Sequence, residues 1–505
     1  MIFPNYWMLF AILFPMTAAF ILQLLHHFAP SKTGGWILLS CGITSLLTFG
    51  AAVSAISGVR VLRLGGWSAD LGVLLVSDPL SAVFLFISAF GGAAAVWTTF
   101  SSLSDSDSGS DAEQWRLCGL FFILWASLNG ILTTGDLFNL FIFYEILAVA
   151  AYVLTGASKT REALEAGLKY LVLGTVGALL ILLATSMLYM GGGILNFALL
   201  SSVVGGIPRG ALAVAAGFMI AGLGLKMGMV PFHFWLPDAH SSASTGVSML
   251  LSGVVVKASF YSLLRVTTLL FPAEQAGFSI PDTLLVLGLL SLFTGHISAQ
   301  RQTSIKRMLA WSTVAHMGYL LIGIGCASPL GVAGALLHSF NHAAAKAALF
   351  LGAGSFSTLS GSKEWRSFTG LGRRFPREGA AFLLLAASII GLPPLGGFWG
   401  KWMIVLAAME KGRWMTAVAV ELGTALSCVY YVPVLFRLFS PRRSEDTPAA
   451  GAFHSGMLFI ALGMTPLLLA LFYFVPSLYE YLISAGEWVV SPALYRDAVL
   501  GSMIP

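Results

Sequence analysis

The chain has 505 residues, of which 57% are hydrophobic and only 10% are charged, and its mean hydropathy is +0.86. Soluble domains carry about 25% charged residues, so this composition excludes a soluble globular protein and indicates one that crosses a membrane many times. The net charge of +5 does not indicate a partner nucleic acid, because the basic residues are spread over short loops rather than gathered in one stripe.

Predicted membrane spans follow one another along the whole chain, at about 20 apolar residues per crossing. They cover residues 6–27, 36–57, 76–100, 115–134, 137–157, 166–190, 211–236, 240–271, 283–299, 305–326, 331–358, 379–408, 414–437 and 455–483. The first is long enough to span and has no basic start, so we expect no cleavable signal peptide. The sequence therefore predicts an all-α polytopic membrane protein with about 14 transmembrane helices.

The orientation follows from the distribution of lysine and arginine. An even number of spans puts both termini on one side of the membrane. The loops after odd-numbered spans hold more lysines and arginines than the loops after even-numbered spans. Since positive loops stay in the cytoplasm, we expect a multi-pass protein of the cell inner (plasma) membrane with both termini on the non-cytoplasmic side.

Two of the predicted spans contain prolines at membrane depth. Pro231 interrupts the seventh span, and Pro393 and Pro394 interrupt the twelfth. Broken helices five spans apart would have opposite topology, which predicts two inverted five-helix repeats with discontinuous helices 7 and 12. The predicted organisation is then 1–110 (helices 1–3), 111–272 (helices 4–8), 273–440 (helices 9–13) and 441–505 (helix 14 and tail).

Ionisable residues occupy the middle of several spans. Lys226 lies five residues before Pro231, and Lys401 lies shortly after Pro393 and Pro394. A lone charge in hydrocarbon costs several kcal/mol, so such residues face a partner or a water-filled path. The full predicted series, in chain order, is Glu145, Lys226, Lys257, His338, His342, Lys346 and Lys401. Spacing of four residues puts His338, His342 and Lys346 on one helix face.

Glu145 and Lys226 form the predicted ion pair of this series, because Lys226 is the first buried cation after Glu145. Burial disfavours the charged form of each group, and pairing restores it. A proton on a neighbouring lysine can therefore bias whether the pair is closed, which makes the pair a switch built from coupled titrations. We predict a proton relay through the whole series.

Each assignment has a simpler alternative. The lysines could snorkel to the membrane interface, and Lys401 beside Gly396 and Gly397 is the most ambiguous of them. His338 and His342 could be interhelical hydrogen-bond partners, and their HxxxH spacing suits zinc, although no third ligand accompanies it. Asp136 and Asp238 are predicted to cap helices. The four single cysteines indicate neither a disulfide nor an iron–sulfur cluster, so we predict no cofactor, no metal and no redox centre on this chain.

Several segments resemble a known family. GDLFNLFIFYEIL (135–147), GLKMGMVPFHFWLPDAH (224–240), NHAAAK (341–346) and GLPPLGGFWGKW (391–402) are similar to the antiporter-like subunits. These are found in the membrane arm of respiratory complex I, in multisubunit Mrp sodium/proton antiporters and in membrane-bound energy-converting hydrogenases. The resemblance covers about residues 75–440, and it implies fourteen helices, two inverted repeats and broken helices seven and twelve.

The resemblance also implies roles for individual residues. Glu145 and Lys226 match the family's Glu–Lys pair, Lys257 its connecting lysine, and His338, His342 and Lys346 its second relay. Lys401 matches the terminal lysine or glutamate of helix twelve; here the chain departs from complex I subunits that carry glutamate. The implied function is proton or cation translocation within a multisubunit membrane complex of the Mrp or hydrogenase type.

Several alternatives stay open at this point. They are a proton-pumping subunit of a quinone-reducing complex I relative, a stand-alone secondary transporter, and a scaffold without transport activity. The implied partners are other antiporter-like and small membrane subunits, lipid, protons, Na⁺ as a further candidate ion, and a peripheral module that would make the complex an NADH, ferredoxin or H₂ oxidoreductase. An intramembrane enzyme is disfavoured, because the sequence shows no nucleophile or metal constellation.

Overall fold

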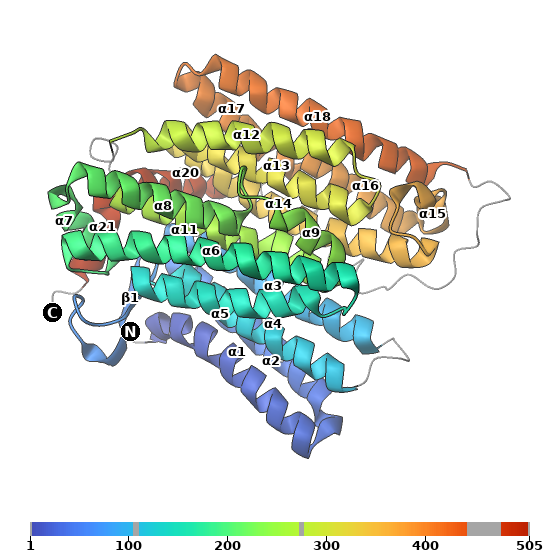
Figure 1. The fold of residues 1–505 in the computed structure, drawn as a ribbon, viewed down its shortest axis with the longest axis horizontal. Helices are drawn as coiled ribbons and strands as arrows, with labels where there is room; N and C mark the ends of the chain where they lie inside the picture. Colours follow the sequence, from blue (N-terminus) through green and yellow to red (C-terminus); the bar gives the residue numbers. More distant parts are fainter. Residues whose placement is uncertain (1–2, 105–110, 272–276, 442–475, 503–505) are drawn as a thin grey trace. The chain divides into compact units, whose positions relative to one another are not determined.

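The structure is a computed structural model that describes residues 3–104, 111–271, 277–441 and 476–502 (Figure 1). These residues are almost entirely helical, and eleven of their helices are long and apolar enough to cross a membrane. The predicted class, an all-α polytopic membrane protein, is confirmed. The chain divides into two compact units, residues 1–227, 254–283 and 485–505 in the first and residues 228–253 and 284–484 in the second.

The first unit begins with four helices that pack on one another. They are α1 (Phe3–Phe28), α2 (Thr33–Ile56), α3 (Pro79–Ser104) and α4 (Asp111–Thr133). Between α2 and α3 the chain forms a hairpin of β1 (Arg60–Arg63) and β2 (Leu74–Ser77), in antiparallel register with Arg60 opposite Ser77. This two-stranded hairpin is the only β-sheet among the described residues.

The remaining helices of the first unit carry its ionisable residues. They are α5 (Leu137–Gly156), α6 (Arg161–Gly192), α7 (Phe197–Val203), α8 (Arg209–Met227) and α11 (Val256–Leu270). α6 packs along α5 and α8, and α11 packs on α8 (Figure 1). The C-terminal α21 (Pro492–Gly501) packs against α7, and the end of α20 (Pro476–Val490) also belongs to this unit.

The second unit is built mainly from six long helices. They are α12 (Ile280–Gln300), α13 (Ile305–Gly325), α14 (Pro329–Ser360), α16 (Pro376–Ile390), α17 (Gly396–Glu410) and α18 (Trp414–Phe439). The short α9 (Trp235–Ser242), α10 (Thr245–Leu250) and α15 (Leu371–Arg374) complete it. α14 packs along α13 and α17, while α9 packs on α13 and α10 on α14.

Both predicted helix breaks are present. α8 ends at Met227, Gly228 has a positive φ of 74°, and helix resumes at Trp235, so Pro231 lies inside the interruption. α16 ends at Ile390, and Pro393 and Pro394 lie between it and α17. A proline cannot donate a backbone hydrogen bond, which explains why the helix cannot continue through either position.

The predicted spans can be compared with the helices. Of the first thirteen, ten coincide with one helix each, and the seventh and twelfth coincide with a pair of helices around a break. The eighth coincides with α10 and α11, which the π-helical segment Leu251–Val255 joins. The span predicted at 455–483 falls mostly outside the described residues. Asp136 caps α5, as predicted, by accepting hydrogen bonds from the backbone of Phe138 and Asn139. Asp238 lies in the first turn of α9, after the N-cap residue Phe234, and its carboxylate lies 2.7 Å from the guanidinium of Arg307, so its capping role stays a prediction.

The two proposed five-helix repeats share internal features. α6 and α14 are both 32 residues long, and each precedes a broken helix that packs along it. An isolated bridge pairs Asp136 before α5 with Asn196 after α6, and another pairs Ser304 before α13 with Glu364 after α14. These parallels support the repeat proposal, while the inverted relation and the repeat boundaries remain predictions.

Candidate functional site

The first part of the site is the Glu145–Lys226 pair in the first unit. Glu145 lies near the middle of α5 and Lys226 near the end of α8, and Glu145 Oε1 lies 3.8 Å from Lys226 Nζ. The Lys226 side chain is 7% exposed, whereas that of Glu145 is 40% exposed. Glu145 is therefore less buried than the sequence suggested, although its Oε1 atom is shielded and accepts no hydrogen bond from the described residues. Lys226 is the partner that compensates this oxygen.

Helices α5, α6 and α8 position the Lys226 ammonium. Lys226 Nζ donates a hydrogen bond of 3.4 Å to the carbonyl of Gly174 on α6, and it lies 5.3 Å from the ring centroid of Tyr144 on α5. The contact between α6 and α8 is close because both carry glycines: a Cβ on Gly222 would come within 2.7 Å of the Gly177 carbonyl. An ammonium over an aromatic face is stabilised electrostatically, so the Tyr144 ring helps to stabilise the charged form of Lys226.

Lys257 lies on the same unit, at the start of α11. It follows a π-helical segment, Leu251–Val255, and its side chain is fully buried. π-Helical turns are frequent at functional sites, because they shift the register of the side chains that follow. Tyr144 connects α5 to α11, since its hydroxyl donates to Ser262 Oγ at 2.9 Å. The predicted burial of Lys257 is confirmed.

The second part of the site is a group of histidines in the second unit. His338, His342 and Lys346 lie along α14 and are all fully buried. The structure adds His316 on α13, which was not predicted from the sequence: its Nδ1 atom lies 2.9 Å from His338 Nε2 and its ring centroid lies 4.8 Å from that of His342. The described residues include no group of three or more His, Cys, Asp or Glu side chains placed to hold a metal ion.

Lys346 is held by two neighbouring helices. Its Nζ donates to the backbone carbonyl of Leu309 on α13 at 2.9 Å and to the Tyr431 hydroxyl on α18 at 3.1 Å. A buried ammonium needs such acceptors to offset the loss of water. Lys346 is therefore bound inside the protein, and the snorkelling alternative does not apply to it.

Lys401 lies on α17 just after the second helix break, and the break supplies its partners. Its Nζ donates to the carbonyls of Ile389 and Ile390 at 3.2 Å and 2.9 Å, and it lies 3.4 Å from Thr424 Oγ1 on α18. These carbonyls end α16, where the helix leaves acceptors unsatisfied and its dipole favours a cation. Gly391 turns the chain away with φ of 92°. Lys401 is 3% exposed, so it too does not snorkel.

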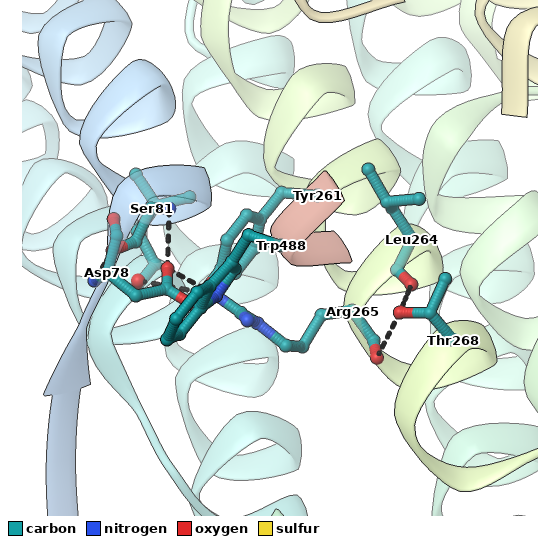
Figure 2. Close-up of polar contacts among 8 residues, drawn as sticks. Asp78, Ser81, Tyr261, Leu264, Arg265, Thr268 and Trp488 are labelled. Carbon is teal, nitrogen blue, oxygen red and sulfur yellow. Dashed lines mark hydrogen bonds and ion pairs between the residues drawn. The ribbon is translucent and has the colours of Figure 1, made fainter. Parts of the chain in front are cut away.

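The first unit also contains a buried ion pair that was not predicted from the sequence (Figure 2). Arg265 Nη2 on α11 lies 2.6 Å from Asp78 Oδ1, and both side chains are almost fully buried. Trp488 of the C-terminal segment donates its Nε1–H to Asp78 Oδ2 at 2.9 Å. The lysines were identified in the sequence because each is a charged residue inside an apolar helix. Arg265 meets the same criterion, so the sequence could also have indicated that it is buried and paired.

This pair holds three distant parts of the chain together. Asp78 also accepts from the Ser81 backbone N–H at the start of α3, and the Arg265 guanidinium lies 4.7 Å from the Tyr495 ring centroid on α21. α3, α11 and the C-terminal segment therefore meet at one carboxylate and one guanidinium. Because Lys257 and Arg265 lie on one helix, the pair also fixes the helix that carries Lys257.

We expect Arg265→Ala to lower the free energy of unfolding by about 3–5 kcal/mol, because it leaves the Asp78 carboxylate buried without its cation. Chemical denaturation of the detergent-solubilised protein would measure this loss. Lys169→Ala, which removes an exposed ion pair with Glu165, serves as the matched control and should change stability by less than about 1 kcal/mol. Equal stability of the two variants would contradict the structural role of the Asp78–Arg265 pair.

Membrane helices that are broken beside buried lysines, with a carboxylate facing one of them, are typical of ion-translocating membrane proteins. The family described as NADH:quinone oxidoreductase/Mrp antiporter, transmembrane, matches residues 134–427, more than half of the chain. The chain belongs to this family, as its resemblance predicted.

Individual relatives come from both branches that the family name joins. The chain is 35% identical over 449 residues to the N subunit of NADH-quinone oxidoreductase from Desulforudis audaxviator, covering 87% of each chain. It is 29% identical over 446 residues to the D subunit of the Na⁺/H⁺ antiporter from Alkalihalophilus pseudofirmus, covering 88% of this chain and 89% of the relative. Among solved structures, a chain of the membrane-bound sulfane sulfur reductase, an archaeal respiratory membrane complex, matches with a TM-score of 0.88 at 26% identity, over 97% of this chain and 99% of that one.

Proposed function

We propose that the chain translocates protons or other cations as an antiporter-like subunit of a multisubunit membrane complex. The observation that carries the proposal is the Glu145–Lys226 pair, in which a buried ammonium at a helix break faces a carboxylate 3.8 Å away. At this distance the two charges attract each other, but the atoms are too far apart for a hydrogen bond. A small change in charge nearby can therefore change the separation of the two groups. This is the property that a coupled switch needs.

The second unit supports the same proposal. Lys346 and Lys401 are buried cations that donate to backbone carbonyls and to hydroxyls. These acceptors carry no formal charge and do not fix the positive charge permanently, so each amine can take up and release a proton. We infer that protons pass through Glu145, Lys226 and Lys257 and then through His338, His342, Lys346 and Lys401.

The relatives support two kinds of complex equally. The sequence favours an Mrp-type antiporter or a hydrogenase-like complex, and the similarity to the D subunit of an Na⁺/H⁺ antiporter supports it. The similarity to the N subunit of an NADH-quinone oxidoreductase supports the alternative, a proton-pumping subunit of a quinone-reducing complex I relative. In either case the partners would be further membrane subunits and, in an oxidoreductase, a peripheral redox module. Na⁺ as a transported ion belongs to the first alternative.

The proposed location is the plasma membrane, with both termini outside the cytoplasm. The support is the excess of lysine and arginine in the loops after odd-numbered spans. Cysteine labelling of the tail near Asp497, which is exposed, with an impermeant reagent on intact cells would test the orientation.

Purification from its native membrane, followed by reconstitution into vesicles, tests the proposal. We expect further membrane subunits to co-purify, and we expect ion transport by the complex but not by this chain alone. Transport by the isolated chain would indicate a stand-alone transporter. Full transport by a complex that lacks the Glu145 carboxylate would indicate a scaffold.

A further inference from the structure

The second unit contains a row of hydrogen-bonding side chains that runs from one of its buried lysines, Lys346, to the surroundings of the other, Lys401. None of the groups between the lysines was predicted as a relay residue. They come from α12, α13 and α18, whereas the predicted histidines lie on α14. We call this set the hydroxyl chain, and its members are Tyr431, Ser312, Tyr430, His296, Tyr319 and Thr424.

The first half of the hydroxyl chain starts at Lys346. Lys346 Nζ donates to the Tyr431 hydroxyl at 3.1 Å, and the Tyr431 hydroxyl lies 3.3 Å from Ser312 Oγ on α13. Tyr430, the preceding residue of α18, donates its hydroxyl to the same Ser312 oxygen at 3.0 Å. Ser312 therefore joins two successive tyrosines whose hydroxyls both reach α13.

The second half runs from Tyr430 to Lys401. His296 Nδ1 on α12 lies 3.1 Å from the Tyr430 hydroxyl, and its Nε2 lies 3.4 Å from the Tyr319 hydroxyl on α13. The Tyr319 hydroxyl lies against the backbone of α18 at Gly423, since a Cβ there would come within 2.7 Å of it, and Oγ1 of the next residue, Thr424, lies 3.4 Å from Lys401 Nζ. The Lys401 ammonium also lies 4.4 Å from the Tyr319 ring centroid.

Every member of this set can both accept and donate a proton. A hydroxyl has one O–H and two lone pairs, so it can receive a proton on one side and release its own on the other. A neutral imidazole does the same through its two nitrogens, and His296 uses both of them here. Except for the half-buried Thr424, the members are at most 4% exposed, so bulk water does not compete for these contacts.

We propose that protons pass between Lys346 and Lys401 along the hydroxyl chain. For each proton, the ammonium at one end loses one N–H bond, each member gains a proton from one neighbour and gives one to the next, and the neutral amine at the other end gains an N–H bond. No electron moves and every member ends with its original number of protons. The inference rests on the proposed function, because it specifies the path between two of its lysines.

The His316–His338 pair offers a competing path. The Tyr319 ring centroid lies 5.3 Å from that of His316 and 5.5 Å from that of His338, so the two routes lie side by side in this unit. The structure favours the hydroxyl chain because defined polar contacts link the Lys346 ammonium to the Tyr319 hydroxyl, and the Tyr319 ring lies next to the Lys401 ammonium. The experiment described below distinguishes the histidine route from the hydroxyl chain.

Two small deletions test the hydroxyl chain in the assembled complex. Tyr430→Phe removes one oxygen and keeps the ring, and Ser312→Ala removes the oxygen that joins the two tyrosines. We expect each to slow proton transport into vesicles, measured with a pH-sensitive dye, on the order of tenfold to 100-fold. Ser427→Ala is the matched control: Ser427 is buried on α18, but its hydroxyl donates within its own helix to the Thr424 carbonyl, so transport should stay at the wild-type rate.

Co-purification must first show that the variants assemble. The transport rates then distinguish the hydroxyl chain, the histidine route and a failure of the proposed function. Slow transport by Tyr430→Phe and Ser312→Ala, with restored transport in Ser312→Thr, supports the hydroxyl chain. Wild-type transport by both variants together with loss in Lys401→Ala overturns the hydroxyl chain and leaves the proposed function standing. Loss in His316→Ala, which removes the histidine that lies outside the predicted relay, would then assign the histidine route. Wild-type transport by Lys401→Ala as well would mean that the proton does not pass through Lys401 and would overturn the hydroxyl chain, whereas wild-type transport by Glu145→Gln would contradict the proposed function itself.

Discussion

Glu145→Gln should abolish ion-coupled transport while the complex still assembles. The substitution keeps the size of the side chain and removes the charge that faces Lys226 at 3.8 Å. The Lys226 ammonium, 7% exposed, then keeps the Gly174 carbonyl and the Tyr144 ring, neither of which carries a charge. Without an opposing charge, the position of Lys226 no longer responds to the protonation of neighbouring groups in the relay. The coupling between the pair and proton movement is then lost.

Two further substitutions at this pair complete the series. Lys226→Ala should also abolish transport, because it removes the cation, whereas Glu145→Asp should keep part of it, because the charge remains on a shorter side chain. Glu165→Gln on α6 is the matched control, since Glu165 is an exposed glutamate paired with Lys169 one turn away. Transport at the wild-type rate in assembled Glu145→Gln would show that the pair is not a switch.

The second large effect is expected at Lys401. Lys401→Ala should block translocation, because it removes the proton-carrying amine that lies between the carbonyls ending α16 and the hydroxyl of Thr424. Lys401→Glu should keep part of it, since a carboxyl group can also carry a proton. The retained rate should be low: the ammonium offers three donors to these acceptors, whereas a protonated carboxyl offers one, and an ionised carboxylate would face the carbonyls of Ile389 and Ile390.

Vesicles that contain the whole complex would measure both variants by the pH gradient they form. Lys411→Ala, after the end of α17, controls for the loss of a lysine in the same region of the chain. Wild-type pumping by Lys401→Ala would mean that the proton leaves by another path, and that Lys401 beside the second helix break does not carry it.

The sequence was sufficient for the long helices among the described residues and for the buried lysines, but not for the buried cation Arg265. Apolar stretches of about 20 residues and prolines at membrane depth are local features, so α8 and α17 could be placed beside their breaks from the sequence. The hydrogen-bond partners of these lysines were harder to predict from the sequence. The carbonyls of Ile389 and Ile390 become available to Lys401 only because α16 ends there, and no residue type marks a free carbonyl.

The relay groups without formal charge were missed for a similar reason. Ser312, Tyr430 and Tyr431 are ordinary residues of membrane helices, and only the packing of α13 against α18 brings their hydroxyls together. Glu145 shows the opposite error: its position in mid-span indicated burial, but the side chain is 40% exposed in this chain. A carboxylate on the outer face of a membrane helix fits a protein that works beside other subunits.

The central claim is that this chain conducts ions rather than supporting other subunits that do so. The most direct measurement is pH-gradient formation by the assembled complex in sealed vesicles, with Glu145→Gln and Lys401→Ala combined in one chain and subunit content verified in the same preparation. We predict a fully assembled complex that has lost the proton transport owed to this chain. An assembled complex that forms the wild-type gradient would contradict the claim and leave the chain as a scaffold.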